Sequence, residues 1–372
     1  MVYSDVLYLQ TFSVRVSTDG RTVLQEGAEL GIGVREIARR TGLSPATVSN
    51  ALSKKRGVSK KASELVFAAA ADLGYQLEED AVTPLPSAID AIRLVVFRNT
   101  GRIVDNSGFR PKIEEGIEAQ VRRHGLKREF LICDVNDKES FLEQAKLICE
   151  DYGTANVFLA TEMREQDYEP FLSSRAPIVL VDSYCRSHHF EAVIADNETG
   201  AWTAARHLLE LGHTRIGYLG GTTRGKNFPK RRQGVEMALA ESGLSLEERF
   251  VVDAGNSLED SYEHVMEWLK GSPDLPTAFF ADNDMIAMGA MRAFRENGID
   301  IPGDVSVVGF DDLDFAAFAT PGLTTMRLPI REMGEMAVRK AVRQARNPRA
   351  YHCVTQICTE LVERKSVRDL RE

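Results

Sequence analysis

The sequence predicts an α/β protein in which two parallel-sheet lobes follow a small three-helix head. From residue 92 onward, short apolar runs that suit buried strands alternate with amphipathic helical runs about a dozen times. Such alternation is typical of parallel sheets with helices on both faces. This is more strands than one ordinary sheet contains, so two lobes are expected. Before residue 78 the chain instead carries short helical runs and an excess of basic residues.

Residues 1–32 form an atypical N-terminal extension. The run DVLYLQTFSVRV alternates as a strand does, and STDGRTV then has the composition of a turn. A small added hairpin, a disordered arm and a start codon assigned too far upstream all remain open.

Residues 33–77 predict three short helices. Val34, Ile37 and Ala38 share one face of the first helix, which ends at Thr41-Gly42. Ser44 offers an N-cap oxygen and Pro45 suits the first helical position. In the second helix Val48 and Leu52 are expected to face inward. In the third helix, capped by Ser59, the expected core residues are Leu65, Val66, Ala69 and Leu73.

A helix-turn-helix follows from this arrangement, because a tight glycine-containing turn joins the first two helices. The second helix of such a pair lies in the DNA major groove. Residues 33–77 hold eight basic and three acidic residues, a net charge of +5 on a chain of net charge −9. A basic module on an acidic protein indicates that the module holds the phosphates of double-stranded DNA.

Residues 78–91 contain two prolines and no long apolar pattern, so they are interpreted as a hinge or linker. Residues 92–372 are expected to form an effector-binding domain. We place its first lobe at about 92–194 plus 326–372 and its second lobe at about 195–325, with glycines that end the helices between strands.

Polar residues end several of the expected strands. Asp182 closes VLVD, Asn283 closes FFADN and Asp311 closes VVGFD, while Arg231 opens a helix just after RIGYLGG. Asp and Asn at strand ends are also common turn formers and N-caps. Because ligands bind outside the carboxyl ends of parallel strands, four such residues at one edge favour a cleft for a polar small molecule.

The composition and the motifs of the chain exclude several classes of protein. No apolar run is long enough to span a membrane and no cleavable signal pattern begins the chain, so a cytoplasmic protein is expected. Five scattered cysteines without a C-x-x-C pair predict neither disulfides nor a metal site. The chain lacks G-x-G-x-x-G, G-x-S-x-G and H-E-x-x-H motifs, so no catalytic residue, cofactor or enzyme activity is expected.

The run IARRTGLSPATVSNAL, with VSKKASELV and ADLGY, resembles the DNA-binding head of the lactose-repressor/galactose-repressor family of bacterial transcription regulators. The resemblance extends over roughly residues 34–367 through VIADNETGAWTAARHLLELGHTRIGYLGG, FFADNDMIAMGAMRAFRENGIDIPGDVSVVGFDD and PGLTTMRLPIREMGEMAV. It implies two lobes of the periplasmic-binding-protein type and a homodimer or dimer of dimers on a near-palindromic operator.

By this resemblance, the base-facing positions of the second helix are Pro45, Ala46 and Asn50. Asn can bond adenine bidentately, and Ala can touch a thymine methyl group. The residues expected at phosphates are Ser44, Thr47, Ser49, Lys54 and Lys60. Family members follow the head with a hinge helix that inserts a Leu into the minor groove, whereas Leu77–Leu85 here holds three acids and Pro84.

The resemblance also assigns effector contacts. It carries them onto Arg231, which precedes Gly234 by three residues, and onto Asn283, Asp311 and Asp182. Phe97 and Arg98, at the end of the first strand, are expected to line the other wall, and Phe310 is expected in the core. Asn256 stands where some members carry an aromatic ring.

We therefore interpret the chain as a sequence-specific repressor controlled by a small polar ligand, with a sugar or sugar derivative expected. Family members also bind nucleobases or nucleosides, which gives a second candidate ligand. A transporter's solute-binding protein would share the lobes but would need a signal peptide and no basic head.

Overall fold

The computed structural model describes residues 34–52, 58–72, 89–100, 108–222, 225–271, 273–348 and 351–371. The chain divides into two compact units, Met1–Leu85 and Pro86–Glu372, and each is described by itself. The extension at 1–32, most of the hinge at 78–91 and Lys54 lie outside the described residues.

Three helices build the head: α1 (Val34–Thr41), α2 (Pro45–Leu52) and α3 (Lys60–Asp72). The Oγ of Ser44 accepts the N–H of Thr47 at 3.1 Å, so it caps α2 as expected. The buried core of the head comprises Ile37, Ala38, Val48, Ala51, Val66, Ala69 and Ala70. Leu65, expected in this core, is half exposed, because its turn of α3 directs Val66 and Ala69 inward instead.

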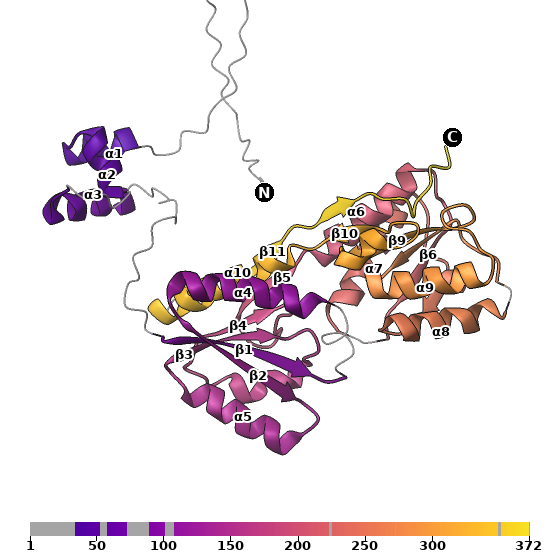
Figure 1. Cartoon of the computed structure of the whole chain (residues 1–372), viewed down its shortest axis with the longest axis horizontal. Coiled ribbons are helices and arrows are strands. Elements are labelled where there is room, and N and C mark those ends of the chain that lie inside the picture. Colours follow the sequence, from indigo (N-terminus) through magenta and orange to yellow (C-terminus); the bar gives the residue numbers. More distant parts are fainter. Residues whose placement is uncertain are drawn as a thin grey trace, which may run out of the picture. The chain divides into compact units, whose positions relative to one another are not determined.

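The first lobe of the second unit has a six-stranded sheet of order β11-β5-β4-β3-β1-β2, in which all neighbours are parallel. In Figure 1, α4 and α10 lie together on one side of this sheet and α5 lies on the other. Its elements are β1 (Ala91–Arg98), α4 (Phe109–His124), β2 (Lys127–Asp134), α5 (Lys138–Glu150), β3 (Thr154–Leu159), η2 (Glu165–Phe171), β4 (Ile178–Val181), β5 (Glu191–Ala195), α10 (Ile330–Arg346) and β11 (Val354–Ile357).

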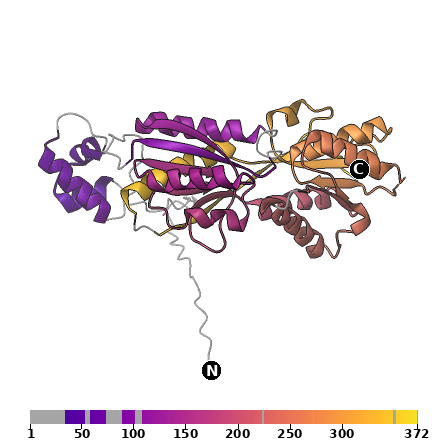
Figure 2. The same cartoon turned by 90° about the horizontal axis from the view of Figure 1, so that it is seen from below.

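The second lobe repeats this order as β12-β10-β9-β8-β6-β7, with only the β10–β12 pair antiparallel among these described strands. Its elements are α6 (Asn197–Glu210), β6 (Ile216–Gly220), α7 (Asn227–Glu241), η3 (Glu248–Phe250), β7 (Val251–Asp253), α8 (Leu258–Leu269), β8 (Ala278–Ala281), α9 (Asp284–Glu296), β9 (Ser306–Asp311), η4 (Asp314–Phe318), β10 (Thr324–Arg327) and β12 (Glu360–Val362). The two lobes lie side by side in both views (Figures 1 and 2).

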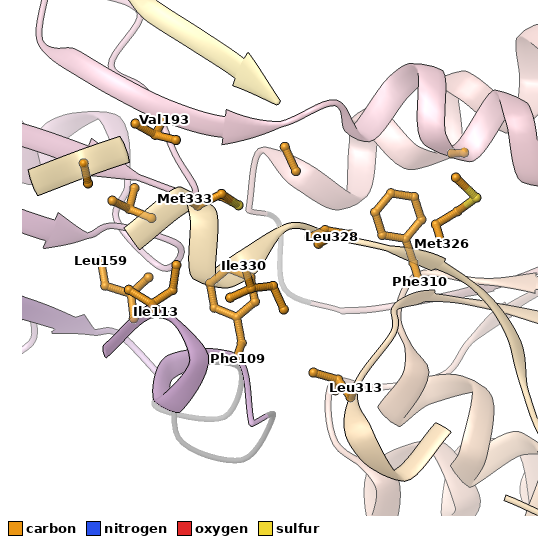
Figure 3. Close-up of a cluster of buried hydrophobic side chains, with 14 of the residues drawn as sticks. Phe109, Ile113, Leu159, Val193, Phe310, Leu313, Met326, Leu328, Ile330 and Met333 are labelled. Carbon is orange, nitrogen blue, oxygen red and sulfur yellow. The ribbon is translucent and has the colours of Figure 1, made fainter. Parts of the chain in front are cut away.

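The central strands β1, β3 and β9 are buried on both faces, which explains their nearly continuous apolar sequences. In the first lobe, alternate strand residues pack on α4 and α10 or on α5 and η2. The α4–α10 layer continues into the α6–α7 layer of the second lobe as one apolar core. Figure 3 shows the junction, where Leu313, Leu328 and Ile330 lie between the two lobes.

The chain crosses between the lobes three times, between β5 and α6, between β10 and α10, and between β11 and β12. The expected division placed all of 326–372 in the first lobe, and this is wrong for β12 and the residues after it. Because β12 pairs with β10, and Ser366 bonds to Val307 and Thr324, the C-terminal segment covers the edge of the second sheet.

Gly234 allows α6 and α7 to approach closely. A Cβ at this position would lie 2.1 Å from the carbonyl oxygen of Glu198 and 2.9 Å from the amide nitrogen of Trp202, both in α6. The two helices could accept this Cβ only by separating. Separation would also displace Arg231, which lies one turn before Gly234 on α7.

Gly234→Ala should therefore lower the free energy of unfolding by about 1–3 kcal/mol, the usual cost of overpacking. Urea denaturation followed by circular dichroism measures this loss. Gly153→Ala is the control, since its nearest contact would be at 3.7 Å, and it should leave stability nearly unchanged. Equal effects of the two substitutions would contradict the packing argument.

Candidate functional site

A buried cluster of charged side chains lies where the carboxyl ends of strands from both lobes meet. Asp182 follows β4 of the first lobe, Asp311 ends β9 of the second, and Arg231 lies in the first turns of α7. All three are nearly inaccessible to solvent. Arg231 pairs directly with Asp311, and its positive charge also opposes the rise that burial causes in the pKa of Asp182.

Arg231 is held by contacts on every side. Its Nη2 lies 3.2 Å from Oδ1 of Asp311, and its Nε donates to Oδ1 of Asn197 at 2.8 Å. Its Nη1 donates to the backbone carbonyl of Asp282. The guanidinium carbon lies 3.9 Å from the ring centroid of Phe310, which is fully buried in the core as expected. The fork is thus fixed in position before any ligand arrives.

The two aspartates have unusual backbone geometry. Asp182 has φ 62° and Asp311 has φ 116°, and residues other than glycine rarely adopt such backbone conformations. Such residues each cost on the order of 1–3 kcal/mol and cluster at functional sites.

Asp311 also retains an open acceptor. Its Oδ1 is buried and has no hydrogen bond among the described residues. The Nη2 of Arg231 lies 3.2 Å from this oxygen, which is close enough for an ion pair but leaves room for a better-aligned donor. A buried acceptor of this kind costs free energy until a donor reaches it.

Asp182 connects the lobes. Its Oδ2 accepts the hydroxyl of Thr161 at 2.7 Å within the first lobe. Its Oδ1 and its backbone carbonyl accept the amide of Asn227, at 2.9 and 3.1 Å, from α7 of the second lobe. The end of β4 is thus tied to the helix that carries Arg231.

Burial alters the ionisation of this cluster. It raises the pKa of Asp182 and of Asp311 to about 6, although the positive charge of Arg231 opposes the shift. Burial also raises the pKa of Asp282 to about 7, against hydrogen bonds from Tyr218 and from the N–H of Gly221.

Two cavities lie at the boundary between the lobes. One, of about 320 Å³, is lined by residues that include Tyr184, Asn197, Lys226 and Asn227. The other, of about 910 Å³, is lined by Lys112, Asp312, Leu328 and further residues of both lobes. Both sizes are in the range of small-molecule sites. Asp182, Arg231 and Asp311 are absent from both linings, but Asn197 and Asn227 of the smaller cavity bond to Arg231 and Asp182.

The structure places the other predicted contacts less favourably. Phe97 is wrong as a wall of the cleft, because its ring is fully buried among Phe141, Phe158 and Phe171 beneath α5. Arg98 is half buried at the end of β1, two strands away from β4.

Asn283 and Asn256 both hold local structure. The Oδ1 of Asn283 accepts the N–H of Ile286 at 2.9 Å, so this residue is the N-cap of α9, the ordinary alternative to a ligand contact. The amide of Asn256 donates to the hydroxyl of Thr222 at 2.5 Å.

Four residues of the cluster were not predicted from the sequence: Thr161, Asn197, Asn227 and Asp282. Thr161 and Asp282 directly follow apolar runs, and Asn197 lies one residue further on, after Asp196, so the rule that identified Asp182 could have found all three. Asn227 carries no such signal, because its role depends on how α7 meets the end of β4.

In the head, the predicted DNA contacts lie on the accessible side of α2 and its surroundings. Ser44, Pro45, Ala46, Ser49, Asn50 and Lys60 are exposed and Thr47 is partly exposed, whereas Val48 and Ala51 are buried. The helix therefore presents one small, polar face to a partner.

The described residues carry neither a membrane-spanning helix nor a grouped set of metal ligands. No described helix is long and apolar enough to cross a membrane. Within the same ranges, no three His, Cys, Asp or Glu side chains are grouped so that they could hold a metal ion.

Comparison with known proteins identifies the family. Residues 34–77 match the family model described as bacterial regulatory proteins, lacI family, and residues 205–367 match that of a periplasmic binding protein-like domain. The regulator GalS of Salmonella typhimurium is 30% identical over 339 residues, which cover 90% of this chain and 96% of GalS. The chain belongs to the lacI family. It is thus a regulator with a helix-turn-helix head and not an enzyme.

Other lacI-family proteins cover most of the chain. The repressor PurR of Photobacterium profundum is 27% identical, over 91% of this chain and 99% of its own length. Among solved structures, the regulator CelR in complex with cellobiose has 24% identity and a TM-score of 0.67, over 90% of this chain and 99% of CelR. The Lac repressor dimer bound to operator and the anti-inducer ONPF has 22% identity and a TM-score of 0.65, over 91% and 99%. These two structures establish the fold.

The raised pKa of Asp282 predicts a pH dependence of stability. The folded state binds this proton more tightly than an unfolded chain with the ordinary pKa of 3.8. The stabilisation that protonated Asp282 gives the folded state is therefore full below pH 4, and it is lost as the pH rises from about 4 through 7.

Asp282→Asn removes this titration, although it also imposes a fixed cost by misplacing one acceptor of Gly221. The stability of the wild type relative to the variant should fall between pH 4 and 7, by at most about 1.4 kcal/mol per pH unit. Urea unfolding at several pH values measures it. If the free energies of unfolding of the two proteins changed in parallel with pH, the raised pKa of Asp282 would be refuted.

Proposed function

We propose that the chain is a sequence-specific transcriptional repressor, a homodimer or dimer of dimers in the cytoplasm, whose operator affinity is controlled by a sugar or sugar derivative bound between the lobes. The observation that carries the ligand class is the open Oδ1 of Asp311 beside the fixed fork of Arg231. A sugar hydroxyl donates to the carboxylate and accepts from the guanidinium at once, which suits this pair.

The same cluster disfavours an anionic ligand. Three carboxylates, those of Asp182, Asp282 and Asp311, surround a single buried guanidinium. A neutral polyhydroxyl ligand adds donors without adding negative charge. The fold neighbours include complexes with cellobiose and with ribose, which supports a carbohydrate.

A nucleobase or nucleoside is the second candidate. The Oδ1 of Asn283 accepts the N–H of Ile286, so its amide nitrogen is the group that, together with a carboxylate, would pair with the edge of a base. The polar Asn256, where some members of the family have an aromatic ring, gives such a base less stacking surface.

Two measurements test the proposal. Selection of genomic DNA fragments by the purified protein should enrich one near-palindromic site, and its neighbouring genes should indicate the ligand. Calorimetric titration with panels of monosaccharides, disaccharides, nucleosides and nucleobases then identifies it. Enrichment of no site, with or without these compounds, would contradict a sequence-specific repressor.

Arg231→Gln should weaken binding of the identified effector by about tenfold to a hundredfold, since it removes charge-assisted hydrogen bonds. DNA affinity without effector should be retained. Arg232→Gln is the matched control, because Arg232 is partly exposed and pairs with Glu236 and Glu248 on the outside of the same lobe. An unchanged effector affinity in Arg231→Gln would remove Arg231 from the site.

Asn50→Ala should reduce discrimination at one base pair in each half-site, at a cost of about 1–3 kcal/mol for the preferred base. Binding to all single-base variants of the enriched operator measures this. Lys60→Ala is the control: as a proposed phosphate contact, it should weaken binding to every sequence alike. Unaltered specificity in Asn50→Ala would refute the assignment of Asn50.

A further inference from the structure

The first residues of α7 reach from the second lobe into the first. The Nζ of Lys226 lies 2.9 Å from Oε2 of Glu165 and donates to the carbonyl oxygen of Tyr184. It also lies 5.2 Å from the ring centroid of Tyr168 and 4.8 Å from that of Tyr184. The side chain of Lys226 is only 14% exposed. The lysine head is thus enclosed by an acid–tyrosine cradle, defined as Glu165, Tyr168 and Tyr184.

The cradle is organised by contacts within the first lobe. The Oε1 of Glu165 accepts the N–H groups of Arg186 at 2.5 Å and Ser187 at 2.9 Å, which leaves Oε2 directed at Lys226. Although burial opposes ionisation, Lys226 and these N–H groups lower the pKa of Glu165 to about 2. Tyr168 is buried and bonds to the hydroxyl of Ser183. The cradle therefore presents a fixed negative charge between two ring faces.

These contacts differ from an ordinary surface ion pair, which contributes little to stability. A partly desolvated ammonium over two aromatic rings interacts more strongly. Lys230, one turn later on α7, shows the contrast. It pairs with Glu198 of α6, in its own lobe, and its side chain is 40% exposed.

We propose that Lys226 is a latch between the lobes: docking of its ammonium in the acid–tyrosine cradle holds the cleft closed and sets how readily it opens for a ligand. The residue beside the latch, Asn227, bonds to Asp182 across the same boundary. Arg231 follows about one turn later on the same rigid helix. Release of Lys226 therefore loosens the two other contacts that form the effector site.

A different contact bridges the lobes on the side of the larger cavity. Lys112 of α4 reaches Asp314 at 2.8 Å and the carbonyl oxygen of Asp312 at 3.4 Å, both in the second lobe. Since Asp314 is largely exposed, this pair is the weaker of the two bridges. When Lys226 is released, the weaker bridge made by Lys112 is expected to break as well, so the connection between β9 and η4 should become more mobile.

Hydrogen–deuterium exchange of the full chain, with no ligand added, tests the latch. Lys226→Met keeps the apolar stem and removes the charge. Exchange should become about threefold to thirtyfold faster, the range that loss of a cation–ring contact gives, in segments 182–187, 227–231 and 311–318 together. Lys226→Arg should restore slow exchange, and Lys230→Met should leave all three segments unchanged.

Within the segment 311–318, residues 312–318 distinguish opening from local damage. Asp311 itself pairs with Arg231 of α7, whereas no hydrogen bond or ion pair among the described residues joins 312–318 to Lys226 or Arg231. An increase confined to 182–187, no increase at all, or an equal increase in Lys230→Met would overturn the proposal. Since no ligand is used, failure here leaves the assignment of the effector untouched.

A second variant guards against misfolding of the first. Glu165→Gln removes the same pair from the other lobe and should speed exchange in the same three segments. The double variant should exchange no faster than Lys226→Met alone, because loss of the ammonium already breaks the pair with Glu165. Additive effects would show that Lys226 and Glu165 act independently and would refute the latch.

Discussion

Burial of one guanidinium organises the site and much of the second lobe. A buried cation must find acceptors, and Arg231 takes them from the start of α6, the end of β8 and the end of β9. These three connections must therefore converge on one point. The same charge offsets the repulsion between carboxylates that would otherwise be desolvated together. Positions of the ligand-facing groups are consequently fixed by the protein and not by the ligand.

The lobes are also held by an apolar core that they share. Leu313, Leu328 and Ile330 pack at the crossovers, between the α4–α10 and α6–α7 layers (Figure 3). Exposure of this junction would cost about 25 cal/mol for each Å² of apolar surface. Motion that opens the cleft must leave the junction buried, so we expect the lobes to rotate about the crossovers and not to separate.

The sequence predicts the fold through alternation, since apolar strands and amphipathic helices in turn leave few arrangements other than parallel sheets. It predicts the convergence of Asp182, Arg231 and Asp311 for the same reason: parallel strands end at a shared edge. Phe97 was misplaced because a strand buried on both faces has no polar side, so its pattern does not show which face a ring occupies. The return of β12 to the second sheet was missed because a three-residue edge strand carries almost no periodic signal. Lys226 was missed too, because a charged residue before a helix reads as solvated until the fold brings Glu165 to it.

The contacts between the lobes therefore fall into two kinds with different consequences. The apolar junction has little reason to change, whereas the polar bridges made by Lys226, Asn227 and Lys112 can break and re-form. A ligand shifts the balance between open and closed forms only through its different affinity for the two. Because Lys226 directly precedes the stiff helix that carries Asn227 and Arg231, a ligand that engages Arg231 and the open oxygen of Asp311 must also alter the bridges at the start of that helix. Each bridge that favours closure raises the affinity for a ligand of the closed form. By reciprocity, that ligand strengthens the bridge by the same factor.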